Sequence, residues 1–171
     1  MSWWRTILQP WRLRAGVPDH AGTGAKAAPT GTTRPHRTAP DYVGAVDVRY
    51  APHLDGDPDP GEVVWTWVPF EEDPSRGKDR PVLLVGHDGP WLLALMLTSK
   101  DHAGDGSSRT GADGRRWLDI GTGAWDSQRR PSEVRLDRVL RVDPASVRRE
   151  GAVLPRTVFD QVTRSMTTLR G

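Results

Sequence analysis

Three apolar stretches in the middle of the chain are separated by short polar segments. The stretch 62–68 (EVVWTWV) is rich in β-branched and aromatic residues, 80–86 (RPVLLVG) has a proline near its start and ends at a glycine, and 91–97 (WLLALML) follows the turn HDGP. Apolar runs of this length between turn signals are typical of β-strands. We therefore predict a strand at each stretch, with the second and third joined as a hairpin.

The apolar pattern changes towards both ends of the chain. Residues 43–50 alternate with a period near two, which predicts an edge strand, and residues 132–142 (SEVRLDRVLRV) resume this alternation. The last apolar residues instead recur every three or four positions, as on one face of a helix that Pro155 would begin: Leu154, Val158, Val162, Met166 and Leu169. The sequence thus predicts a mainly β (α+β) fold, in which one C-terminal helix covers a small barrel or sandwich of short strands.

Residues 1–40 lack such a pattern. Residues 15–40 consist mainly of Gly, Ala, Pro, Thr and charged residues, and they have too few apolar side chains to offset the entropy lost on folding. Residues 1–14 (MSWWRTILQPWRLR) combine Trp with Arg, which suits either a partner-binding segment or a frayed terminus. We predict a disordered basic tail over 1–40 and a barrel domain over 41–171, with its core in 60–171.

The composition excludes several classes of protein. Gly and Pro supply 18 and 15 of the 171 residues, which disfavours a helical bundle. The absence of cysteine excludes disulfides, thiolate metal sites and cysteine nucleophiles; it fits a reducing compartment, and we expect a cytoplasmic protein. No apolar run is long enough to span a membrane. The acidic residues and histidines lack metal-site spacing and no nucleotide-binding motif occurs, so we expect neither metal nor cofactor.

Charge is distributed unevenly along the chain. Residues 41–106 carry thirteen acidic and five basic side chains, whereas residues 107–171 carry thirteen arginines and eight acidic side chains. A polyanion would therefore bind the C-terminal half or the tail in preference to the acidic middle. Four of the arginines lie close to Trp117 and Trp125 in the sequence and are candidates for an RNA-binding face: Arg115, Arg116, Arg129 and Arg130. The alternative is a solvated, arginine-rich surface.

Two blocks of the chain resemble the MazF/PemK-type toxins of type II toxin–antitoxin systems. GEVVWTWVPFEEDPSRGKDRPVLLVG contains a Gly-acid pair, an aliphatic–Trp strand, a polar loop and an Arg-Pro-aliphatic run. SEVRLDRVLRVDPASVRREGAVL contains a Ser-x-Val-x-Leu-Asp-x-Val run, a Val-Asp turn and a Gly-x-Leu-like lead into the terminal helix. The resemblance covers about residues 60–171. The chain departs from the family at Asp137-Arg138, where the family has Asp-Gln, and in the loop EEDPSRGKD.

The resemblance implies a fold, an activity and partners. It implies an SH3-like barrel that forms a homodimer, and a sequence-selective endoribonuclease that cleaves single-stranded RNA such as mRNA without a metal until a cognate antitoxin blocks it. The catalytic arginine of the family matches Arg80, and its catalytic Thr or Ser matches Thr98, with Ser99 beside it. A catalytically inactive barrel that binds nucleic acid or protein as a regulator is the alternative.

The side chains at these positions suit phosphodiester chemistry. A planar guanidinium such as that of Arg80 binds two phosphate oxygens at once, and the Thr98 hydroxyl would position the phosphate. Ser99 and His102 are auxiliary candidates, the latter as an acid or base. The competing interpretations are structural, namely a salt bridge of Arg80 with Asp79 or Glu72 and a bond from the Thr98 hydroxyl to the backbone.

Overall fold

The computed structural model describes residues 37–99 and 108–171, and these residues form eight β-strands, one short 3-10 helix and one α-helix. In chain order they are β1 (Glu62–Pro69), β2 (Gly77–Asp88), β3 (Trp91–Thr98), β4 (Ser108–Thr110), β5 (Arg116–Gly121), β6 (Ser132–Arg135), β7 (Leu140–Val142), η1 (Pro144–Ser146), β8 (Arg149–Val153) and α1 (Arg156–Arg170). The strands predicted at 62–68, 80–86 and 91–97 and the C-terminal helix are confirmed. The predicted disordered tail lies outside the described residues, except for residues 37–40.

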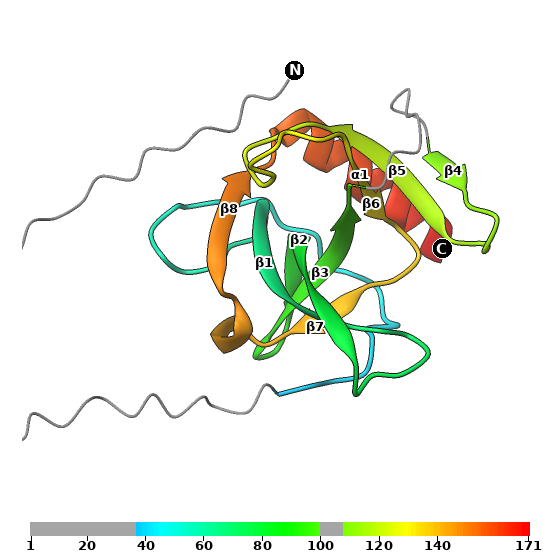
Figure 1. Ribbon diagram of the computed structural model, residues 1–171, viewed down its shortest axis with the longest axis horizontal. Helices are drawn as coiled ribbons and strands as arrows, with labels where there is room; N and C mark the ends of the chain where they lie inside the picture. The colour runs from blue at the N-terminus through cyan, green and yellow to red at the C-terminus, as the bar shows by residue number, and fades with distance from the viewer. Residues whose placement is uncertain (1–36, 100–107) are drawn as a thin grey trace, which may run out of the picture. The chain divides into compact units, whose positions relative to one another are not determined.

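The described strands form one antiparallel sheet in the order β4-β5-β6-β3-β2-β1-β8, with β7 also paired to β3. Strand β3 is shared: residues 92–94 pair with β7, and Leu97 and Thr98 pair with β6. The register shifts in three strand pairs, β1–β8, β2–β3 and β5–β6. Such irregularities bend a sheet, and Figure 1 shows strands that curve around a common centre. This confirms the predicted mainly β, small barrel-like fold.

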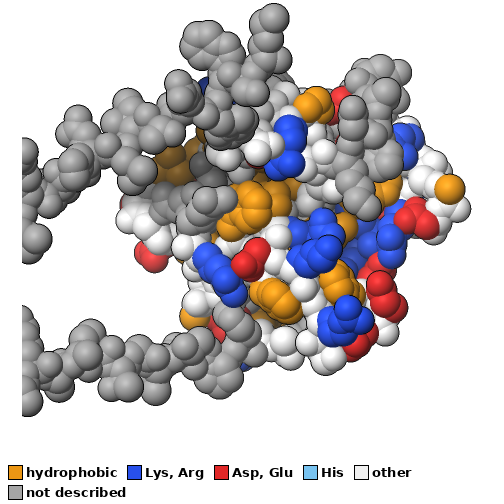
Figure 2. Space-filling view, in the orientation of Figure 1, with side chains coloured by type: hydrophobic (Ala, Val, Ile, Leu, Met, Phe, Trp, Pro, Cys, Tyr) orange, Lys and Arg blue, Asp and Glu red, His pale blue; other side chains and the backbone are white. Residues whose placement is uncertain are grey.

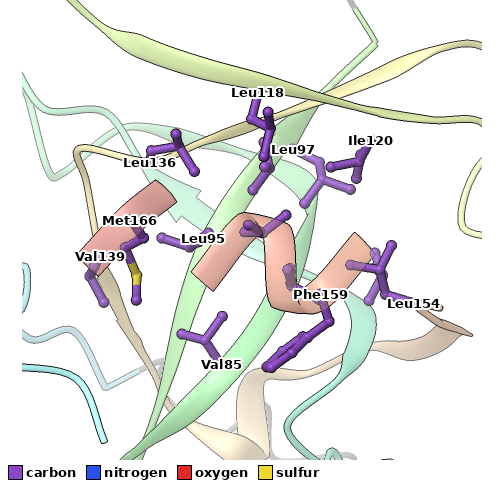
Figure 3. Packing of buried hydrophobic residues seen from close by; sticks show 14 of the residues in the cluster. Val85, Leu95, Leu97, Leu118, Ile120, Leu136, Val139, Leu154, Phe159 and Met166 are labelled. Carbon is purple, nitrogen blue, oxygen red and sulfur yellow. The ribbon is translucent and has the colours of Figure 1, made fainter. Parts of the chain in front are cut away.

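Both faces of the central strands are buried, which explains their nearly continuous apolar runs. One face carries the larger core, where Val85, Leu95 and Leu97 pack with Phe159 and Met166 of α1 (Figure 3). The opposite face carries a smaller core, whose members come from β1, β2, β3 and β7: Val64, Val68, Val82, Leu84, Leu92, Ala94, Leu140 and Val142. The period of three to four in the last apolar residues therefore marks the face of α1 that packs on the sheet.

The predicted edge strand at 43–50 is wrong. In this region only Tyr42 makes an isolated bridge, to Val139, and the backbone N–H of Arg49 donates to Val85 O. We call residues 40–50 the N-terminal strap. Backbone carbonyl oxygens and one carboxylate of residues 40–44 accept hydrogen bonds from three arginines: Arg138, Arg141 and Arg170. Four side chains of the strap still pack on the larger core, namely those of Tyr42, Val46, Val48 and Tyr50, so the alternation reflects partial burial and not ladder hydrogen bonds.

Other strands differ in extent or were not predicted. Strand β2 begins at Gly77, three residues before the predicted start, because Pro69 pairs with Gly77 and extends the β1–β2 ladder. A Cβ at Gly77 would collide with Val68 O and the Trp67 ring, so glycine permits this close approach. The short strands β4 and β8 lie in segments where the sequence showed no apolar alternation, and pairing with β5 and β1 defines them. Residues 132–142 form two strands, β6 and β7, with different parts of β3 as partners.

Candidate functional site

Strand pairing brings Arg80 and Thr98 together although they are distant in the sequence. Val82 of β2 pairs with Met96 of β3, and the same antiparallel register, continued by two residues, places Arg80 across from Thr98. On its other side Arg80 pairs with Thr66 of β1. The side chains of Arg80 and Thr98 therefore share one face at the end of the β2–β3 pair, and both line the same cavity.

This cavity, which we call the first cavity, has a volume of about 550 Å³. Arg80, Met96 and Thr98 line it from β2 and β3, and the β4–β5 hairpin supplies the other lining residues: Arg109, Gly111, Ala112, Asp113, Arg115 and Trp117. Its wall combines the apolar side chains of Met96, Ala112 and Trp117 with three guanidinium groups and one carboxylate. Such a site attracts an anion that also carries flat, apolar groups.

Arg80 differs from the other two arginines of the first cavity. Within the described residues its side chain makes no ion pair or hydrogen bond, and the neighbouring Asp79 pairs instead with Arg148 at 2.9 Å. The alternative interpretation, a salt bridge of Arg80 with Asp79 or Glu72, is therefore not what the structure shows. The half-buried Arg80 guanidinium keeps its donors available for a bound anion.

Arg109 and Arg115 are held by carboxylates. Arg109 donates two hydrogen bonds to the buried Glu133, at 2.9 and 2.7 Å, in the bidentate arrangement that suits a guanidinium and a carboxylate. Arg115 donates to Glu71 at 3.1 Å and to Asp113 at 3.0 Å. The charges of these two arginines are thus largely compensated, so Arg80 is the arginine of this wall that has no carboxylate partner among residues 37–99 and 108–171.

A buried arginine anchors the loop between β1 and β2 beside the first cavity. Arg135 binds Glu71 through two nitrogens, at 2.6 and 3.0 Å, and also binds Asp137. The hydrogen bonds from Arg135 lower the pKa of Glu71, with a smaller contribution from the charge of Arg115. Glu71 therefore stays ionised, and it ties the loop to β6 and to the β4–β5 hairpin.

A second, smaller cavity of about 270 Å³ lies next to the first and shares Arg80 and Thr98 with it. Ser99 lines this second cavity and does not line the first. Arg130 also lines it, and Asp126 fixes that arginine by accepting from its Nε at 2.8 Å and its backbone N–H at 3.0 Å. The hydrogen bond from the Arg130 side chain is the main reason that the pKa of Asp126 falls to about 2.

The four predicted RNA-binding arginines differ in whether they line a cavity. Arg115 lines the first cavity and Arg130 the second, whereas Arg116 and Arg129 line neither. Arg129 is exposed with a φ of 50°, and Arg116 is half-buried. His102 lies outside the described residues. In the space-filling view, blue Lys and Arg side chains gather on the right of the molecule with red acidic side chains beside several of them (Figure 2).

Several lining residues were not predicted from the sequence. Arg109 lies in a short strand within a Gly- and Ser-rich segment, and only its pairing with β5 brings it to the cavity. Met96 and Trp65 belong to strands whose apolar patterns predict burial and not a site. The departure at Asp137-Arg138 is structural, since Asp137 binds the Arg116 backbone N–H and Arg138 binds Asp41 of the strap.

No group of three or more His, Asp or Glu side chains in residues 37–99 and 108–171 is placed to hold a metal ion. Among the same residues, no helix has the length and apolar character needed to cross a membrane.

Comparison with known families agrees with this arrangement. The family model for PemK-like, MazF-like toxins of type II toxin–antitoxin systems matches residues 59–169. The chain belongs to this family. The matched range contains Arg80, Thr98 and every residue that lines the two cavities, but it leaves out the N-terminal strap. Membership identifies the protein as a type II toxin and implies an antitoxin partner. A search of curated proteins found no match to the chain.

Proposed function

We propose that this PemK/MazF-like toxin is a metal-independent, sequence-selective endoribonuclease that cleaves single-stranded RNA, with Arg80 and Thr98 at the reacting phosphate. The observation that carries the proposal is that Thr98 and Arg80, which has no carboxylate partner among the described residues, line one wall of a cavity that also holds Met96 and Trp117. A phosphodiester supplies the anion for Arg80, and the attached bases suit the aromatic part of the wall.

The reaction would use the 2′-hydroxyl of the RNA as its nucleophile. The 2′ oxygen forms a bond to phosphorus and gives up its proton to a base. The bond from phosphorus to the 5′ oxygen breaks, and that oxygen takes up a proton. Negative charge increases on the non-bridging oxygens on the way, and this is the charge that the Arg80 guanidinium would stabilise. The Thr98 hydroxyl would orient the phosphate, and His102 is the candidate for proton transfer.

The pairing of the other arginines supports this division of roles. Glu133 binds Arg109, and Glu71 and Asp113 bind Arg115. These carboxylates compensate most of the positive charge of the two arginines. Among the described residues of the wall, Arg80 is therefore the arginine whose charge is most available to a phosphate. The homodimer and the cytoplasmic location that the family resemblance suggests are proposed on that ground alone.

The experiment that tests the proposal incubates the purified protein with a randomised single-stranded RNA pool in the presence of EDTA. We expect cleavage that leaves 2′,3′-cyclic phosphate and 5′-hydroxyl ends, because the 2′ oxygen is the nucleophile and no metal is needed. Loss of cleavage in EDTA, restored by Mg²⁺, would contradict the proposal. Tight RNA binding without any cleavage would favour the alternative of a regulatory binding barrel.

A further inference from the structure

The second cavity has no role in the reaction just described, yet it borders the same two residues. Arg80 and Thr98 line both cavities, whereas the rest of each wall is different. The first cavity extends from this pair towards the β4–β5 hairpin. The second extends towards β1 and the β5–β6 loop, where Trp65, Trp125 and Arg130 line it. The proposed phosphate position therefore has a separate hollow on each of two sides.

The two walls share a chemistry although they share few residues. The first offers Trp117 and Met96 with nearby guanidinium groups, and the second offers Trp65 with the guanidinium of Arg130. Aromatic side chains next to cations are the combination with which proteins bind single-stranded nucleic acid, since bases stack on the rings and phosphates bind the cations. Each cavity thus offers an aromatic ring for a base and a guanidinium for a phosphate.

Hydrogen bonds hold the wall of the second cavity in place. The Trp65 indole N–H donates to Trp125 O at 3.2 Å, and the Trp125 indole N–H donates to Ser132 Oγ at 3.1 Å. The Trp125 ring lies so close to Gly123 that any side chain there would collide with it. Arg130 is fixed by Asp126. A wall with its side chains already positioned loses little conformational entropy when it binds a base, so it can discriminate between bases.

We propose that the two cavities are subsites for the two nucleotides on either side of the cleaved bond, one nucleotide in each cavity. This inference rests on the proposed function, because it takes the phosphate at Arg80 and Thr98 as its fixed point. An RNA chain leaves that phosphate in two directions, and the structure has a cavity on two sides of the pair. It follows that different residues set the base preference on the two sides of the cut, with Trp65 in one set and the β4–β5 hairpin in the other.

The test compares cavity variants by sequencing the products from a randomised single-stranded RNA pool. Trp65→Leu removes one of the two tryptophans that line the second cavity, and Ala112→Phe fills the first from an exposed position in the β4–β5 turn. We expect Trp65→Leu to weaken the base preference on one side of the cut by about 5- to 100-fold. Ala112→Phe should alter the preference on the other side. The matched control is Trp67→Leu on the same strand, which lines neither cavity and should cut as the unsubstituted protein does.

A second variant keeps the test decisive if Trp65→Leu fails to fold. Ser99→Leu places an apolar side chain in the second cavity from the half-buried residue that follows β3, so it should alter the same side of the cut as Trp65→Leu. Variants of both cavities changing the same side, or no variant changing either side while cleavage still depends on Arg80, would overturn the inference. A protein that makes no Arg80-dependent cut in any RNA would instead overturn the proposed function, and this inference with it.

Discussion

The arginines at the N-terminal strap differ from the arginine at the centre of the candidate site. Arg138 binds both carboxylate oxygens of Asp41 and the carbonyl of Pro69, and Arg170 binds the carbonyls of Tyr42 and Gly44. Arg80 has no such partner within the described residues. One region uses its guanidinium groups to join chain segments, and the other leaves one guanidinium able to bind something else.

This difference separates structural from functional arginines in a chain that has many of them. Moving a guanidinium away from water is costly unless acceptors replace the lost hydration. Arg138, whose side chain is 8% exposed, meets that condition through Asp41 and Pro69. Arg80 is only half-buried and keeps water as an alternative partner, which an incoming phosphate can displace. Whether an arginine has a carboxylate partner therefore indicates the site better than the number of arginines in a region does.

The largest effect on stability should come from breaking a strap contact. Arg138→Ala removes the partner of Asp41 and leaves the Pro69 carbonyl without its side-chain donor. We expect the free energy of unfolding to fall by about 2 to 3 kcal/mol, somewhat less than for a fully buried pair because Asp41 is partly exposed. Urea denaturation followed by circular dichroism measures this change.

Arg49→Ala is the matched control for the strap. Its pair with Asp47 has both side chains largely exposed, so the change should lie within about 0.5 kcal/mol. Equal losses in Arg138→Ala and Arg49→Ala would show that the strap is not held by its buried arginine contacts.

The parts of the fold that were predicted correctly are those where burial decides the pattern. Continuous apolar runs gave β1, β2 and β3, and the period of three to four gave α1. The strap resembles a strand in sequence because side chains at alternate positions pack on the core, while arginines from distant positions bind its carbonyls. Residue-by-residue patterns do not reveal such long-range partners.

The candidate site was predictable only where the family motif marked it. Arg80 and Thr98 matched the motif, and strand register then brings them together. Arg109 carries no such mark, and it reaches the cavity through a three-residue strand. Of Arg115, Arg116, Arg129 and Arg130, which were grouped by sequence proximity, Arg115 lines the first cavity and Arg130 the second, and their role in RNA binding stays a prediction.

A smaller loss of stability should follow when the ion pair between Arg130 and Asp126 beside the site is broken, and this loss should depend on pH. Arg130 holds the pKa of the buried Asp126 at about 2, below the value of about 4 expected for an unfolded chain. A carboxyl group with a lowered folded-state pKa stabilises the protein above the unfolded pKa, and this contribution disappears as the pH falls through the folded pKa. Asp126→Asn should therefore cost about 2 kcal/mol at pH 7, and the difference from the unsubstituted protein should shrink between pH 5 and pH 2.

Urea denaturation across that pH range tests the Asp126 prediction. Asp160→Asn is the control, because its ion pair with Arg156 lies on the exposed face of α1 and contributes little. A cost for Asp126→Asn that does not change with pH would contradict the assignment of the effect to the ionised carboxylate.

The smallest effect on stability should accompany the largest effect on activity, at Arg80. The central claim is that this arginine serves an RNA phosphate and not the fold, and single-turnover cleavage of an RNA oligonucleotide that the toxin cuts tests it most directly. We predict that Arg80→Ala unfolds within about 0.5 kcal/mol of the unsubstituted protein and cleaves on the order of 10²- to 10³-fold more slowly, as when one charge-stabilising donor is lost. Arg164→Ala, at an exposed position of α1, should cleave at the full rate. Full activity in Arg80→Ala, or an equal loss in Arg164→Ala, would contradict the account.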